Sequence, residues 1–152
     1  LNISSKYLLP GQPFSGPCLK KDTLALSNSL SDLIKDSSII KQINISNEKQ
    51  IDIVIKKIEN MDYKKIGFYG LEFKEGSGDI RNSYILKLIN RIKGKKIHVF
   101  DENISNELEN SLIKTCVIEK TFTDLLDNTD VVFAKSSSKK EKTKKLILLD
   151  NL

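Results

Sequence analysis

Cysteine, histidine and long hydrophobic runs are all scarce in this chain. Its 152 residues contain two cysteines, Cys18 and Cys116, and a single histidine, His98. Two distant thiols and one imidazole are too few for a zinc cluster or a disulfide framework, so we expect no metal site and a reducing cytoplasm. No apolar stretch approaches the roughly 20 residues that cross a bilayer, so we expect a soluble protein without a membrane partner.

A secretion signal is also missing. Residue 1 is leucine, and residues 1–6 show neither a charged start followed by an apolar run nor a cleavage site. We therefore expect a fragment of a longer protein rather than a secreted precursor. A chain of this length can bury a real core, but it is short for a two-substrate enzyme with a cofactor.

The excess of positive charge is modest and dispersed. Lysine and arginine number 25 against 20 acidic residues, which gives a formal charge of +5. The densest basic run, residues 135–145, also holds three serines and Glu141 and has no aromatic side chain. We interpret it as a solvated loop, with anion binding as the alternative, and we expect no nucleic-acid partner.

The hydrophobic pattern changes near residue 62. Before it, residues 22–60 repeat apolar side chains at helical spacing. After it, short apolar strands alternate with amphipathic helices, with strands expected at 65–70, 96–100, 116–118, 130–134 and 145–149 and helices at 83–93, 105–113 and 122–128. This alternation predicts an α/β fold with a parallel sheet and right-handed crossovers. We expect two units: residues 1–61, and a Rossmann-like nucleotide-binding domain at 62–152.

The helical segment at 22–60 needs a partner. An isolated pair of helices cannot bury both of its apolar faces, so the pair should pack on another domain or on a second copy of the chain. We therefore expect this segment to mediate a homodimer.

Cys18 is the residue best suited to chemistry. It follows Gly16-Pro17 at the start of a helical pattern, with Lys20 and Lys21 close behind. A helix N-terminus and nearby cations favour the thiolate, so we predict a nucleophile. A lone cysteine is more often a small buried hydrophobe, which is the role we assign to Cys116.

Two loops could hold a ligand. Residues 7–17 combine prolines, glycines and aromatics, which is typical of a rigid loop that presents its backbone. Residues 71–83 leave the first strand and enter a helix, where open α/β sheets bind ligands. This loop lacks a dinucleotide fingerprint, so phosphate contacts would come from Lys74 and Arg81, unless these are plain surface charges. Asp101, after the second strand, is expected to be a cap or loop residue.

The two loops together resemble a known family. The segments YLLPGQPFSGPCLKKD at 7–22, GLEFK at 70–74 and DIRNS at 79–83 are similar to motifs of the UDP-glucose/GDP-mannose dehydrogenase family. The resemblance implies the carboxyl-terminal portion of an NAD-dependent nucleotide-sugar 6-dehydrogenase, which oxidises a UDP- or GDP-hexose for polysaccharide synthesis. A non-catalytic nucleotide-binding or assembly module that lacks the NAD domain is the alternative.

The resemblance also implies roles for single residues. Cys18 would carry the sugar as a thiohemiacetal and then a thioester, and Asp22 would assist water and proton transfer. The other implied contacts are substrate binding by Tyr7, Gly11, Ser15, Gly16 and Lys74, and NAD binding by Lys21 and Arg81. The family usually has glycine where Ser15 stands, which predicts an altered sugar pocket. Its glycine-rich NAD fingerprint has no counterpart here, so this chain should not bind NAD unaided.

Overall fold

The computed structural model describes residues 11–30, 39–74, 76–105, 112, 114–135 and 145–152. Two helices come first, α1 (Cys18–Ser29) and α2 (Ile39–Asn60). The remaining elements are β1 (Lys65–Tyr69), α3 (Tyr84–Arg91), β2 (Lys96–Phe100), β3 (Val117–Ile118), α5 (Phe122–Asn128), β4 (Val131–Ala134), β5 (Leu146–Leu148) and the 3-10 helix η2 (Leu149–Asn151). The predicted α/β alternation is confirmed, and most of the helix expected at 105–113 lies outside the described residues.

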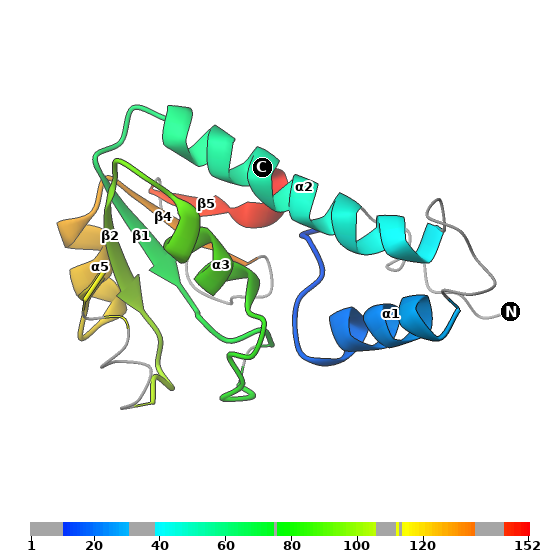
Figure 1. Ribbon diagram of the computed structural model, residues 1–152. Helices are drawn as coiled ribbons and strands as arrows, with labels where there is room; N and C mark the ends of the chain where they lie inside the picture. The colour runs from blue at the N-terminus through cyan, green and yellow to red at the C-terminus, as the bar shows by residue number, and fades with distance from the viewer. Residues whose placement is uncertain (1–10, 31–38, 75, 106–111, 113, 136–144) are drawn as a thin grey trace, which may run out of the picture.

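The strands form one parallel sheet in the order β3-β2-β1-β4-β5. Because the order reverses between β1 and β4, the carboxyl ends of these two strands mark the usual ligand crevice of an open α/β sheet. The loop of residues 70–83 leaves β1 at this point and leads into α3. Figure 1 shows this loop on the side of the sheet that faces α1.

Helices cover both faces of the sheet. On one face, the second half of α2 and the whole of α3 join β1, β2 and β4 in one hydrophobic cluster. On the other face, Leu125 of α5 packs against β1 and β4. Gly67 lets α5 approach closely, since a Cβ there would lie 3.1 Å from Leu125 Cδ1. The second half of α2 belongs to the predicted unit 1–61 but packs in the same hydrophobic core as the sheet. The boundary between the two predicted units, at residue 62, stays a prediction.

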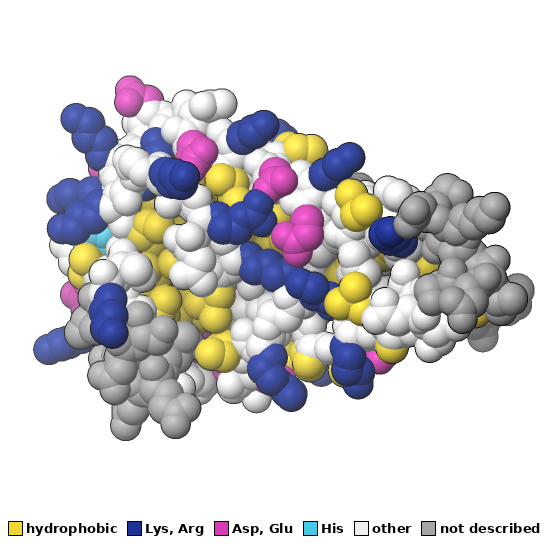
Figure 2. Space-filling model, viewed as in Figure 1, with side chains coloured by type: hydrophobic (Ala, Val, Ile, Leu, Met, Phe, Trp, Pro, Cys, Tyr) yellow, Lys and Arg dark blue, Asp and Glu magenta, His cyan; other side chains and the backbone are white. Residues whose placement is uncertain are grey.

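The first half of α2 extends past the sheet, with α1 alongside it (Figure 1). No side chain of α1 is fully buried. Large hydrophobic side chains stay exposed on both helices: Leu19, Leu24, Leu26, Ile39, Ile43, Ile45 and Ile53. Figure 2 shows apolar side chains between charged ones along α2. Within the part of the chain that the structure describes, none of the helices is both long and apolar enough to span a membrane.

Three residues to which we assigned no catalytic role are structural. Cys116 is buried, as predicted, and burial raises the pKa of its thiol. His98 is buried too, with Nδ1 2.6 Å from Oε1 of Glu119. Asp101 is a loop residue, as expected: its Oδ2 accepts from Leu71 N–H at 2.5 Å, and its Oδ1 accepts from the N–H of residue 103 at 2.8 Å.

The core role of α2 predicts unequal effects of two isoleucine truncations on this helix. Ile58 is 0 % exposed in the cluster with the sheet, whereas Ile53 is 54 % exposed. Ile58→Ala should lower the free energy of unfolding by about 2–5 kcal/mol through lost burial and a cavity. Ile53→Ala should change it by less than about 0.5 kcal/mol. Urea denaturation of both variants measures the difference, and equal losses would contradict this packing.

Candidate functional site

Cys18 is the first residue of α1, and its side chain is exposed. Pro17 occupies the N-cap position, with φ −78° and ψ −27°, and provides no side-chain cap. The first turn of α1 contains no acidic residue. The positive end of the helix dipole therefore lies next to the thiol without a neutralising carboxylate in that turn.

The segment just before Cys18 is bound to the loop after β1. Gly16 N–H donates to the carbonyl of Asn82 at 3.2 Å, and Asn82 Nδ2 donates back to the carbonyl of Gly16 at 2.9 Å. Gly16 has φ +88°, and a Cβ on it would lie 2.7 Å from Cδ2 of Phe73. Only glycine fits this conformation and this space. The segment before Cys18 and the loop between β1 and α3 therefore lie directly against each other at Gly16.

Arg81 directly precedes Asn82, the residue bonded to Gly16, and its guanidinium pairs with Asp79. The guanidinium Nε is 3.0 Å from both carboxylate oxygens, and Nη2 is 2.6 Å from Oδ2. These hydrogen bonds are the main reason that the pKa of Arg81 is raised. The same hydrogen bonds hold the pKa of Asp79 below its usual value. The ion pair of Arg81 and Asp79 thus lies at the molecular surface, in the loop that binds the segment before Cys18.

Glu72 closes the loop that carries Lys74. Its buried carboxylate accepts from Gly78 N–H at 2.9 Å and from Ser77 N–H at 3.2 Å. The backbone amides of this glycine-rich turn are therefore occupied by the protein's own carboxylate. Lys74 and Arg81 are both exposed, and the guanidinium of Arg81 is paired with the carboxylate of Asp79.

The sequence of this chain matches a known protein family. Residues 67–146 match the model of the UDP-glucose/GDP-mannose dehydrogenase family, UDP binding domain. The chain is a member of this family. The family resemblance predicted from the two loop motifs is therefore confirmed.

Named relatives and solved structures agree. The chain is 36 % identical over 106 residues to the GDP-mannose 6-dehydrogenase of Pseudomonas putida, covering 68 % of this chain and 24 % of that protein. It is 30 % identical over 132 residues to the UDP-glucose 6-dehydrogenase of Rickettsia bellii, covering 75 % of this chain and 30 % of that protein. A GDP-mannose dehydrogenase structure from Pseudomonas aeruginosa shares the fold, with TM-score 0.78, 23 % identity, and coverage of 98 % of this chain and 42 % of that one. The chain thus spans less than a third of the two curated relatives' length.

The other residues that the family resemblance singled out lie around the same loops. Asp22 follows Cys18 by one helical turn, on the same face of α1. Its carboxylate is exposed and lies 3.7 Å from Nζ of Lys21, which is also exposed. Ser15 is half-buried and Gly11 is exposed. Tyr7 lies outside the described residues.

The sequence analysis assigned no role to four residues that hold these two loops in place. Glu72 and Asp79 fix the loop after β1, and Asn82 and Asn47 hold the loop before Cys18. The available signals were a carboxylate next to an apolar strand, an acid two residues before Arg81, and an asparagine in an apolar helical stripe. Among the residues that the structure describes, no group of three or more histidine, cysteine or acidic side chains could hold a metal.

Gly16 provides a test of how the two loops meet. Gly16→Ala places a methyl group against the ring of Phe73 and at a strained φ, which should lower the free energy of unfolding by about 1–3 kcal/mol. Gly11→Ala is the matched control, because no atom lies within 4 Å of the added Cβ. Chemical denaturation compares the two variants. Equal stability of Gly16→Ala and the unmodified chain would refute the close approach.

Proposed function

We propose that this chain is the nucleotide-sugar-binding portion of an NAD-dependent nucleotide-sugar 6-dehydrogenase, which oxidises a UDP- or GDP-hexose at C6 to the uronate. One observation supports the proposal most directly: the Gly16–Asn82 hydrogen bonds join the segment before an exposed cysteine at a helix N-terminus to the loop that carries Arg81, in a chain that matches a UDP binding domain. A reactive thiol, a cation and a nucleotide-binding fold are the parts that this chemistry needs.

The substrate's diphosphate is the natural partner of the exposed Lys74. The ammonium of Lys74 binds phosphate oxygens through charge-assisted hydrogen bonds. In this proposal the loop that contains Gly11, Ser15 and Gly16 lies along the nucleotide sugar, together with Tyr7.

NAD does not fit this domain by itself. Both oxygens of Asp101, at the end of β2 where a ribose-binding acid would stand, are taken by backbone N–H groups. The amides of Ser77 and Gly78, in the glycine-rich turn, donate to Glu72. We therefore place NAD in the part of the family's enzymes outside this chain, with Lys21 and Arg81 contributing contacts to it.

Cys18 performs the covalent step. Its thiolate attacks the C6 aldehyde of the substrate, a C–S bond forms, and the carbonyl oxygen takes a proton to give a thiohemiacetal. NAD, when bound, would accept two hydrides from C6: the first as the alcohol becomes the aldehyde, and the second as the thiohemiacetal, which also loses its hydroxyl proton, becomes a thioester. Asp22, one turn along α1, positions the water that opens the thioester, which releases the uronate and restores the thiol.

Nucleotide-sugar binding by the 152-residue chain tests the proposal. Calorimetry with a UDP-hexose and a GDP-hexose should detect binding of at least one of them. Lys74→Ala should weaken it about tenfold or more, because a charge-assisted hydrogen bond to phosphate is lost. Lys96→Ala is the matched control, since this exposed lysine lies at the amino end of β2, away from the loops.

Three outcomes separate the readings. Absence of binding to either sugar would contradict the proposed function. Binding that survives Lys74→Ala would contradict the assigned site. A complete enzyme that forms uronate at the normal rate with Cys18→Ser would support the non-catalytic nucleotide-binding reading of this portion and contradict the thiol mechanism.

We further propose that α1 and the first half of α2 pair with a second copy of the chain. The supporting observation is the exposure of large side chains such as Leu26 at 49 % and Ile45 at 40 % on helices that extend past the sheet. Sedimentation at micromolar concentration should show a dimer that Leu26→Glu with Ile45→Glu converts to monomer. Thr123→Glu, exposed on α5, should leave the dimer intact. A monomeric unmodified chain would contradict this assembly.

A further inference from the structure

Asn47 occupies a position in α2 where the helical pattern favours a hydrophobic side chain. It lies one turn before Ile51, at the start of the buried stripe that continues through Val54, Ile55 and Ile58, and it is 6 % exposed. A buried amide costs free energy unless both its oxygen and its nitrogen find partners. The hydrogen bonds of Asn47 therefore define its role.

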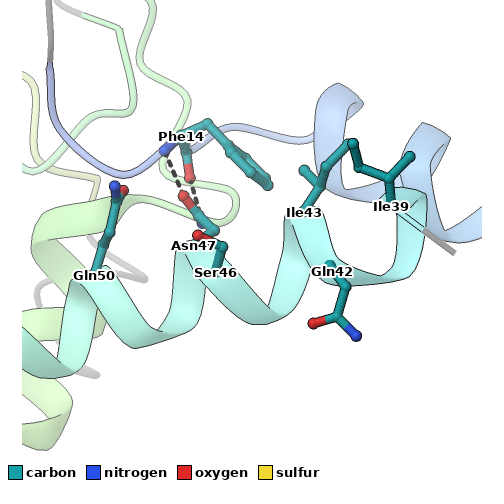
Figure 3. Close-up of a pocket in the computed structure, with 7 residues that line it drawn as sticks. All are labelled: Phe14, Ile39, Gln42, Ile43, Ser46, Asn47 and Gln50. Carbon is teal, nitrogen blue, oxygen red and sulfur yellow. Dashed lines mark hydrogen bonds between the residues drawn. The ribbon is translucent and has the colours of Figure 1, made fainter. Parts of the chain in front are cut away.

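Both ends of the Asn47 amide bind the backbone of Phe14. Oδ1 accepts from Phe14 N–H at 2.8 Å, and Nδ2 donates to the Phe14 carbonyl at 3.1 Å, across 33 positions of sequence. Figure 3 shows this pair and the ring of Phe14 turned toward Ile43. The ring lines a groove of about 380 Å³ on α2. Phe14 is thus held to α2 by its backbone.

Two asparagines from different elements thus share the loop before the thiol. Phe14 gives both of its backbone polar groups to Asn47, and Gly16 gives both of its own to Asn82. Cys18 follows Gly16 by two residues. Because Asn82 anchors the loop to the β1–α3 connection and Asn47 anchors it to α2, the position of the thiol depends on both anchors.

We propose that Asn47 is a positioning residue for Cys18: by holding Phe14, it keeps the thiol close to the loop that carries Arg81. The proposal rests on the function proposed above, because that function makes the thiol the nucleophile. Asn47 itself touches only the loop backbone, so it acts on the reaction through the placement of the sulfur.

Two alkylating reagents measure this placement on the 152-residue chain. Neutral iodoacetamide and anionic iodoacetate react with the same thiolate. The ratio of the iodoacetate rate to the iodoacetamide rate at Cys18 therefore does not depend on how exposed or how ionised the thiol is. This ratio rises when positive charge lies near the thiol. Peptide mass spectrometry separates Cys18 from the buried Cys116. Arg81→Ala should lower the iodoacetate-to-iodoacetamide ratio about threefold to fivefold, the effect of one unit charge near an exposed thiol.

Asn47→Ala should lower the ratio to nearly the value of Arg81→Ala. Asn44→Ala is the matched control, because Asn44 lies on the same helix and donates to Thr23 Oγ1 of α1 at 2.9 Å without touching the loop. Its ratio should equal that of the unmodified chain. An unchanged ratio in Asn47→Ala would overturn the proposal, and so would an unchanged ratio in Arg81→Ala, since the thiol would then not lie close to the loop that carries Arg81.

A measurement on the unmodified chain covers the case in which Asn47→Ala fails to fold. The amide of Phe14 should exchange its hydrogen about tenfold or more slowly than in an unstructured peptide of the same sequence, because it donates to Asn47. Exchange at the peptide rate would overturn the proposal. Failure of calorimetry to detect nucleotide sugars would contradict the proposed function alone, since the alkylation ratio is measured without ligand.

Discussion

Two hydrogen bonds between Gly16 and Asn82 hold the candidate site together. They join segments 66 positions apart and require a residue without a side chain at position 16, where the ring of Phe73 lies against the backbone. This contact joins the start of α1, where the exposed thiol of Cys18 lies, to the loop that carries Arg81. Residues 67–146 of the chain match a UDP binding domain.

The parallel sheet positions one of the two loops that meet at this contact. The loop that carries Lys74 and Arg81 leaves β1 where the strand order reverses, and Glu72 occupies the backbone amides that a phosphate would otherwise use. The loop is therefore stiffened from within, and its recognition of an anion falls to side chains. The first half of α2 binds the loop before Cys18 through Asn47. The second half of α2 packs in the hydrophobic core with the sheet.

Much of this architecture is readable from the sequence. The strand expected at 96–100 matches β2, and the thiol expected at a helix start is the first residue of α1, because apolar periodicity and helix starts are local properties. The contacts that build the site are not local. Nothing near Asn82 or Asn47 in sequence indicates that each pairs with the backbone of the loop before Cys18. Sequence motifs could name the cations, but the structure was needed to reveal what holds Arg81 and what occupies the glycine-rich turn.

The most direct test of this account is the proton contact between Gly16 and Phe73 in the nuclear Overhauser spectrum of the 152-residue chain. The account predicts cross-peaks between the Gly16 Hα protons and the Phe73 ring, because a Cβ at Gly16 would lie 2.7 Å from that ring. An assigned spectrum of the folded chain with no such cross-peaks would show that the two loops do not meet, and the shared site would not exist.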